Sequence, residues 1–286
     1  MRAPGKILII LMLLLHKSSQ QEAFNDQATL IAPKIVGWME ALNDDTLISD
    51  ITIPGTHDSL ALHGGLFAEC QAWRLEDQLM AGIRYFDFRV SGIRLIIMHD
   101  WFNKHVFFSD VFNTIKRFLS VYKSETVLVR VNAEFFHLMS KVPDLVADTI
   151  ENDISLVEET IPTIGEVRGK IVLVPNNAFT LGIPLFETDQ RNDYIVTDVE
   201  LNKEKNRQHL TEARDDKSRN VIVVLNYSSG TGWPKFRPFE PPKSLASKIN
   251  PWLYDHLNNE SNTHPKPCFG VIAMDYLIRK IIEFNQ

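Results

Sequence analysis

The sequence alternates short runs rich in valine and isoleucine with longer segments of helical periodicity, and this alternation constrains the fold most strongly. The runs are mostly continuous in hydrophobicity, which is typical of strands that are buried on both faces of a parallel sheet. We expect strands at 49–53, 83–90, 93–98, 126–131, 170–174, 194–197, 220–225 and 270–274.

The clearest helical pattern covers residues 109–122, with Ser109 or Asp110 as its N-cap. Interleaved strands and helices in this number favour an α/β fold of the (β/α)8 TIM-like barrel type, including an irregular or incompletely closed barrel. An open doubly wound sheet is the alternative, but no glycine-rich phosphate loop follows the first expected strand. Further helices are expected at 75–80, 141–159, 203–217 and 241–257.

The N-terminus has the pattern of a secretory signal. Arg2 and Lys6 precede an apolar run at 7–15, which is too short to span a bilayer, and polar residues follow at 16–21. We expect residues 1–20 to be a cleaved signal peptide and residues 21–286 to form a single domain of a secreted, extracellular protein. An uncleaved anchor or a buried helix is the alternative.

Composition fits one globular domain and argues against a nucleic-acid binder. The chain is 44% hydrophobic and 23% charged, and its net charge is −6 rather than basic. The chain has two cysteines, Cys70 and Cys268. They could form one disulfide, but sequence cannot show whether they meet. Sequons at Asn226 and Asn259 could carry glycans in a secreted protein.

Polar side chains gather where several expected strands end. In a barrel of parallel strands, these carboxyl ends surround a single mouth, where active sites lie. Two histidines, several carboxylates and an arginine would therefore converge. The residues are His57, Asp58, Asp87, Arg89, His99 and Asp275.

This combination is suited to general acid–base phosphoryl transfer. One histidine can accept a proton from the attacking hydroxyl while the other donates one to the leaving oxygen. Carboxylates orient the imidazoles, and an arginine neutralises charge on the phosphate. A single histidine at a strand end is more often structural, so the inference depends on the residues occurring together.

Four segments resemble a known family. Residues 53–59 (IPGTHDS), 78–89 (QLMAGIRYFDFR), 124–126 (SET) and 271–276 (VIAMDY) are similar to the X-domain of phosphatidylinositol-specific phospholipases C. The match is best to the small bacterial-type enzymes and their single-domain eukaryotic relatives, and it runs from about Thr46 to the C-terminus. It implies cleavage of phosphatidylinositol or glycosylphosphatidylinositol (GPI)-type lipids, releasing diacylglycerol and a cyclic or free inositol phosphate.

The resemblance also assigns catalytic roles. His57 matches the general base that deprotonates the inositol 2-hydroxyl, and Asp275 matches the carboxylate that orients it. His99 matches the general acid for the diacylglycerol oxygen, with Asp58 as its carboxylate partner. Arg89 matches the arginine that stands where calcium-dependent relatives bind their metal, so we expect neither a metal nor a cofactor.

The head-group pocket departs from the family pattern. Asn132 stands where bacterial enzymes have lysine, Asn176 where they have arginine, and Glu200 where an aromatic residue stacks on the sugar. Glu134 and Asp198 match acidic pocket residues. The substrate-binding set is therefore expected to be Asp87, Asn132, Glu134 and Asp198.

Each of these assignments has a competing interpretation. Asp87 would hold Arg89 in place, but a purely structural buried pair is the alternative. The changed pocket leaves two other functions open: a phospholipid-binding protein without turnover, and a phosphodiesterase for another phospholipid.

The segment 227–239 resembles the family loop that enters the lipid surface. Trp233 and Phe236, with basic neighbours, are suited to transient contact with a phospholipid membrane surface. Ordinary packing of these aromatic residues over the top of the barrel is the alternative.

Overall fold

The computed structural model describes residues 36–92, 95–99, 102–133, 142–150, 160–176, 182–188, 195–215, 222–232, 240–264 and 267–276. The expected signal peptide at 1–20 lies outside these ranges. Within them, no helix has both the length and the apolar character needed to cross a membrane.

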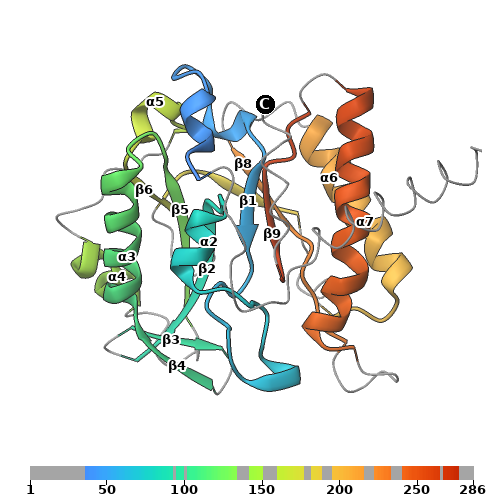
Figure 1. Cartoon of the computed structure of the whole chain (residues 1–286), viewed down its shortest axis with the longest axis horizontal. Helices are drawn as coiled ribbons and strands as arrows, with labels where there is room; N and C mark the ends of the chain where they lie inside the picture. The colour runs from blue at the N-terminus through green and yellow to red at the C-terminus, as the bar shows by residue number, and fades with distance from the viewer. Residues whose placement is uncertain are drawn as a thin grey trace, which may run out of the picture.

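A curled sheet of parallel strands forms the centre of the molecule, with β1 (Ile53–Thr56) in its middle (Figure 1). On one side of β1 the order continues through β2 (Tyr85–Ser91), β5 (Val127–Ala133) and β6 (Ile171–Val174). On the other side it continues through β9 (Val271–Met274), β8 (Val223–Tyr227) and β7 (Leu185–Glu187). All ladders between these strands are parallel, as the apolar runs predicted.

The barrel closes weakly between β6 and β7. Across this seam, Ile183 N donates a backbone hydrogen bond to Leu173 O (3.1 Å), and in the described part of the chain no ladder joins the two strands. Gly182 has a φ of +130°, and a Cβ there would lie 2.3 Å from Leu173 O, so only glycine allows this approach. The expected TIM-like barrel is therefore confirmed in a distorted form, with a strongly curled sheet and one poorly paired seam.

Helices cover the outside of the sheet (Figure 1). The expected pattern at 109–122 forms α3 (Phe108–Val121), whose apolar face lies against the sheet and whose opposite face is polar. The other α-helices are α2 (Leu75–Met80), α4 (Val142–Ile150), α5 (Ile164–Val167), α6 (Val199–Asp215) and α7 (Pro242–Thr263). The 3₁₀ helices are η1 (Trp38–Ala41), η2 (Ile48–Asp50) and η3 (Gly65–Phe67).

A hairpin replaces one expected parallel strand. β3 (Ile96–His99) is antiparallel to β2, with Ser91 opposite Ile96, and β4 (Phe102–Phe107) is antiparallel to β3. The reason is connection length, because a parallel pair needs a crossover of about a dozen residues or more, whereas β3 begins five positions after β2 ends. The antiparallel register carries the chain back along β2, with Val90 opposite Ile97.

Three other expectations need correction. The segment expected as the first strand, 49–53, begins within η2, and β1 starts only at Ile53. The strand expected at 194–197 is reduced to an isolated bridge from Ile195 to Thr231. β7 was not expected, because a strand of three residues is too short to show a hydrophobic period.

The structure also answers two open questions. Cys70 and Cys268 are both buried and are not joined in a disulfide. Asn226 is buried, and its side chain donates to Phe269 O (2.8 Å) and accepts from Thr188 (2.9 Å), so this sequon is not available to a glycan in the folded protein. Asn259 is exposed on α7.

Candidate active site

The inside of the barrel changes from apolar to polar towards its mouth. Side chains alternate between the two faces of a strand, so residues two apart point the same way. On β2, Tyr85 belongs to the inner hydrophobic cluster, and Asp87 and then Arg89 follow it on the same face. On β9, Ala273 belongs to that cluster, and Asp275 comes directly after the strand end. The alternation of side chains thus places polar groups at the mouth of the barrel and apolar side chains deeper inside it.

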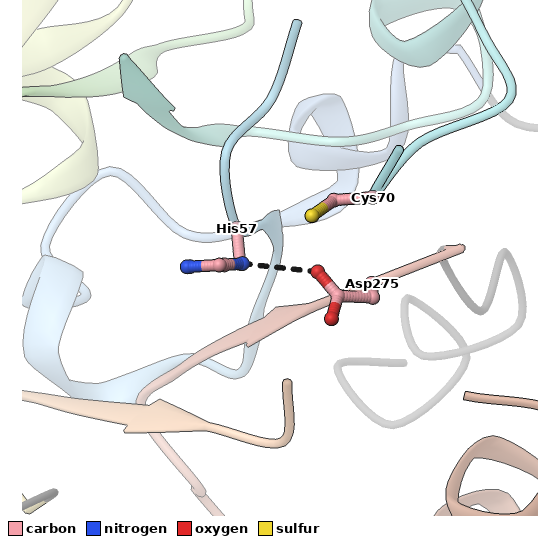
Figure 2. Close-up of side chains that lie close together, drawn as sticks. All are labelled: His57, Cys70 and Asp275. Carbon is pink, nitrogen blue, oxygen red and sulfur yellow. Dashed lines mark hydrogen bonds and ion pairs between the residues drawn. The ribbon is translucent and has the colours of Figure 1, made fainter. Parts of the chain in front are cut away.

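His57 is held at the end of β1 by Asp275. Its Nδ1 lies 3.0 Å from Asp275 Oδ1, and its backbone N donates to Met274 O (3.1 Å). Both side chains are buried, with residue exposures of 4% for His57 and 2% for Asp275, so water competes little for this bond. Figure 2 shows the pair facing each other from β1 and β9. The predicted orienting role of Asp275 agrees with this geometry.

The other ring nitrogen of His57 faces a carboxylate and a guanidinium. Its Nε2 lies 3.3 Å from Asp58 Oδ2 and 3.4 Å from a terminal nitrogen of Arg89. Arg89 in turn forms an ion pair through Nε with Asp58. Asp58 adopts a φ of 41°, a left-handed conformation that aspartate tolerates better than most residues. Asp58 therefore contacts His57 and Arg89, and its predicted partnership with His99 remains a prediction.

These contacts raise the pKa of His57 to about 9. Burial by itself lowers this pKa, because it disfavours the charged imidazolium. The negative charges of Asp58 and Asp275 outweigh burial, and Arg89 opposes them only in part. His57 is therefore an imidazolium at neutral pH in the absence of substrate.

A network of buried amides and hydroxyls fixes the loop that carries His57. Gln71 donates to both His57 O (2.8 Å) and Met274 O (2.9 Å), which ties the ends of β1 and β9 together. Gln78 donates to Ser59 O (2.7 Å) and accepts from Thr56 (2.9 Å). The loop that carries His57 is thus held in place, because backbone oxygens in it are bonded by side chains from α2 and the segment before it.

Gly55 allows close packing at the end of β1. A Cβ at Gly55 would lie 2.7 Å from the ring of Tyr85, far inside normal contact. The glycine therefore lets Tyr85 fill the barrel directly beneath His57.

Asp87 is buried next to two asparagines rather than beside a lysine. Asn132 donates to Asp87, and Asn176 donates to the side-chain oxygen of Asn132 (2.9 Å). Burial and, next, the nearby Asp58 carboxylate raise the pKa of Asp87. Asn132 thus lies beside the site, as predicted. Arg89, which Asp87 was expected to hold in place, forms an ion pair with Asp58.

Sequence reasoning missed a second polar cluster inside the barrel. Arg130 donates to the Tyr227 hydroxyl (2.7 Å) and to Glu187 (2.7 Å). The Tyr227 ring lies edge-on to His57, with centroids 5.7 Å apart. The available signal was Arg130 itself, the only charged residue within the apolar run of β5.

The remaining predicted residues are placed differently or lie outside the described part. Asp198 is exposed and accepts a hydrogen bond from Leu201 N (2.9 Å) at the start of α6, and Glu200 pairs with Lys203. The side chain of His99 falls outside the described residues, although its backbone ends β3. Glu134, Trp233 and Phe236 also fall outside them.

Two groups of described residues bring three possible metal ligands within 4.8 Å of one another. His57, Asp58 and Asp87 form the first, and Arg89 already supplies a positive charge there. His57, Cys70 and Asp275 form the second (Figure 2).

The fold and site together define a class: an α/β barrel with a buried histidine–carboxylate pair and an arginine at its mouth, suited to acid–base chemistry on an anionic substrate. Residues 45–176 match the family model described as "Phosphatidylinositol-specific phospholipase C, X domain". The 1-phosphatidylinositol phosphodiesterase of Listeria monocytogenes is 34% identical over 281 residues, covering 87% of this chain and 84% of that protein. The Staphylococcus aureus (strain Newman) enzyme of the same name is 26% identical over 304 residues, covering 87% and 94%.

Solved structures show the same fold. The phosphatidylinositol-specific phospholipase C from L. monocytogenes superposes with a TM-score of 0.74 and 24% identity, covering 88% of this chain and 98% of that one. A S. aureus phospholipase C structure gives a TM-score of 0.72 and 21% identity, covering 88% and 97%. The chain belongs to the phosphatidylinositol-specific phospholipase C X-domain family, and it is an enzyme of the phospholipase C type.

Proposed function

We propose that the protein is a secreted phosphodiesterase that cleaves the glycerol–phosphate bond of phosphatidylinositol or GPI-type lipids without a metal. The observation that carries this proposal is the placement of His57 between Asp275 and the Asp58–Arg89 ion pair. This arrangement puts one imidazole nitrogen against an orienting carboxylate and the other where a reacting group and a fixed positive charge can meet.

The chemistry follows from the two faces of the imidazole. Asp275 holds the proton of Nδ1, so in the neutral ring Nε2 is the nitrogen that accepts a proton. The inositol 2-hydroxyl gives its proton to Nε2, and its oxygen attacks phosphorus. The glycerol oxygen then leaves with a proton from His99. Arg89 stabilises the negative charge that builds up on the phosphate oxygens.

Secretion and membrane contact belong to the same proposal. Residues 1–20 have the pattern of a signal peptide, and the loop containing Trp233 and Phe236 has the composition of an interfacial segment. One S. aureus relative was solved in connection with modulation of its membrane binding. These points support a protein that acts transiently at the outer surface of a membrane.

A panel of lipid vesicles tests the substrate. The purified protein should release diacylglycerol from phosphatidylinositol vesicles, release a GPI-anchored protein from a membrane, or do both, and His57→Ala should abolish the release. Binding to phosphatidylinositol vesicles with no product above the His57→Ala background would show a binding protein instead of an enzyme.

One observation favours a second candidate, a phosphodiesterase for a different phospholipid. Asn132 donates to Asp87 and accepts from Asn176, so this side of the site offers amides where a bacterial-type pocket offers cations. The same panel, extended to phosphatidylcholine, phosphatidylglycerol and their lyso forms, distinguishes the two. Turnover confined to one of these lipids would support the second candidate.

A further inference from the structure

Cys70 lies beside the catalytic histidine, although nothing in the acid–base chemistry uses it. Its sulfur, a ring nitrogen of His57 and a carboxylate oxygen of Asp275 all lie within 4.8 Å of one another. Figure 2 shows the Cys70 side chain directed toward the His57–Asp275 pair. All three residues are less than 5% exposed.

The backbone holds the three residues together. Cys70 N donates to Ala61 O (2.9 Å), and Cys70 O accepts from Tyr276 N (2.9 Å), the residue next to Asp275. The neighbouring Gln71 fixes the backbone of His57 and of Met274. The second oxygen of Asp275 accepts a hydrogen bond from Gly230 N (3.4 Å), and this bond orients the carboxylate. Such outer contacts are what a metal site needs to keep its ligands in place.

The donor set selects a particular kind of cation. Thiolate, imidazole and carboxylate together suit zinc and its thiophilic analogue cadmium, whereas calcium and magnesium take oxygen ligands. Tetrahedral zinc with these donors needs ligand separations of about 3.4 to 3.6 Å. The three ligand atoms already lie within 4.8 Å of one another, so modest side-chain rotation closes the triangle. One thiolate and one carboxylate also balance the charge of a divalent ion, which reduces the free-energy cost of burying it.

We propose that Cys70, His57 and Asp275 form an inhibitory site for a thiophilic divalent cation such as zinc. Coordination displaces the proton from His57 Nδ1, and the thiol proton is released to solvent. The ligated neutral imidazole carries its remaining proton on Nε2, which then cannot accept one from a substrate hydroxyl. The bound cation therefore prevents His57 from acting as the base. This inhibitory role rests on the proposed function, in which His57 is that base.

Metal binding can be tested without measuring activity. The full-length protein is stripped with a chelator and titrated with cadmium chloride, and the ultraviolet charge-transfer absorption of a cadmium–thiolate bond is recorded after long incubation, since the site is buried. Wild type should show one saturable band, and Cys70→Ser should show none. Cys268→Ser is the matched control, because Cys268 is also buried but donates to Ser49 O (3.2 Å) away from the site, and it should keep the band.

The carboxylate ligand has its own variant. Asp275→Asn should weaken cadmium binding by about tenfold or more, the range for losing a group that supports a metal site. The proposal is overturned if wild type gives no band, if Cys70→Ser keeps it, or if Cys268→Ser loses it.

An activity arm separates this proposal from the proposed function. On phosphatidylinositol vesicles, zinc should inhibit the wild-type protein, and a chelator should reverse the inhibition. The half-inhibitory concentration of zinc should be at least tenfold higher for Cys70→Ser. Each rate is taken relative to that of the same protein without zinc. Equal zinc sensitivity in the two proteins would overturn the proposal. If the metal-free protein has no turnover at all, the proposed function fails, while the cadmium band still decides the metal site.

Discussion

Nδ1 of His57 lies 3.0 Å from Oδ1 of Asp275, although the two residues are 218 positions apart in the chain. β1 and β9 are neighbouring parallel strands, and their register pairs Thr56 with Met274. The residue that follows each strand therefore meets the other at the barrel mouth. Together with the nearby charge of Asp58, this pairing makes His57 a strong base.

The rate should rise with pH in the range set by His57. Its pKa is raised to about 9, so the base is mostly protonated at pH 7, and kcat/KM should increase as pH rises towards about 9. Asp58→Asn removes the largest contribution that raises this pKa, so the rising limb should move to lower pH. The pH dependence of kcat/KM on a soluble short-chain substrate measures both. An unmoved limb in Asp58→Asn would show that another group controls it.

A substrate with a good leaving group should separate the two histidines. His57→Ala and His99→Ala should each reduce turnover by about a hundredfold or more on phosphatidylinositol, the range for a positioned proton-transfer group. The activated substrate should restore the His99→Ala enzyme but not the His57→Ala enzyme, because only the work of the acid has been made easier. Recovery of both variants would mean that the roles are assigned wrongly.

Turnover should survive a calcium chelator. The guanidinium of Arg89 is paired with Asp58 beside His57, so it supplies the fixed positive charge that a metal would otherwise provide. Phosphatidylinositol hydrolysis is measured with and without chelator, and the rate should not fall. A rate that is lost in chelator and recovered with added calcium would contradict this.

Trp233→Ala should weaken binding to phospholipid vesicles while leaving hydrolysis of a soluble short-chain substrate nearly unchanged. Loss of an interfacial aromatic side chain costs about 1 to 2 kcal/mol of partitioning. Vesicle co-sedimentation and short-chain kinetics are compared in the same preparation. Equal damage to both would indicate that Trp233 packs against the barrel.

Glu125→Gln should destabilise the fold. Glu125 precedes β5 and is fully buried against the guanidinium of Arg84, which precedes β2, with an N–O distance of 2.8 Å. Removing its charge leaves a buried cation uncompensated, at a cost of about 3 to 5 kcal/mol. Urea unfolding measures this cost, and Glu204→Gln is the control, because its exposed pair with Arg207 should contribute less than about 1 kcal/mol. Similar losses in the two variants would contradict a special role for the buried pair.

The sequence by itself determined most of the parallel strands and the residues that follow them. Continuous apolar runs identified most of β2, β5, β6, β8 and β9, because strands buried on both faces need such runs. The carboxyl ends of parallel strands share one edge, so His57 and Asp275 could be expected at a common mouth. Local pattern was sufficient there because a residue's position relative to the end of its own strand decides where it points.

Only the tertiary structure decided which of these groups contact one another. Asp58 pairs with Arg89 and faces His57, and Arg130 reaches Tyr227 and Glu187 across the barrel. Cys70 lies beside His57 because backbone hydrogen bonds tie its loop to the residue after Asp275. These contacts join positions distant in sequence, and their distances depend on strand order and register, which no local period encodes.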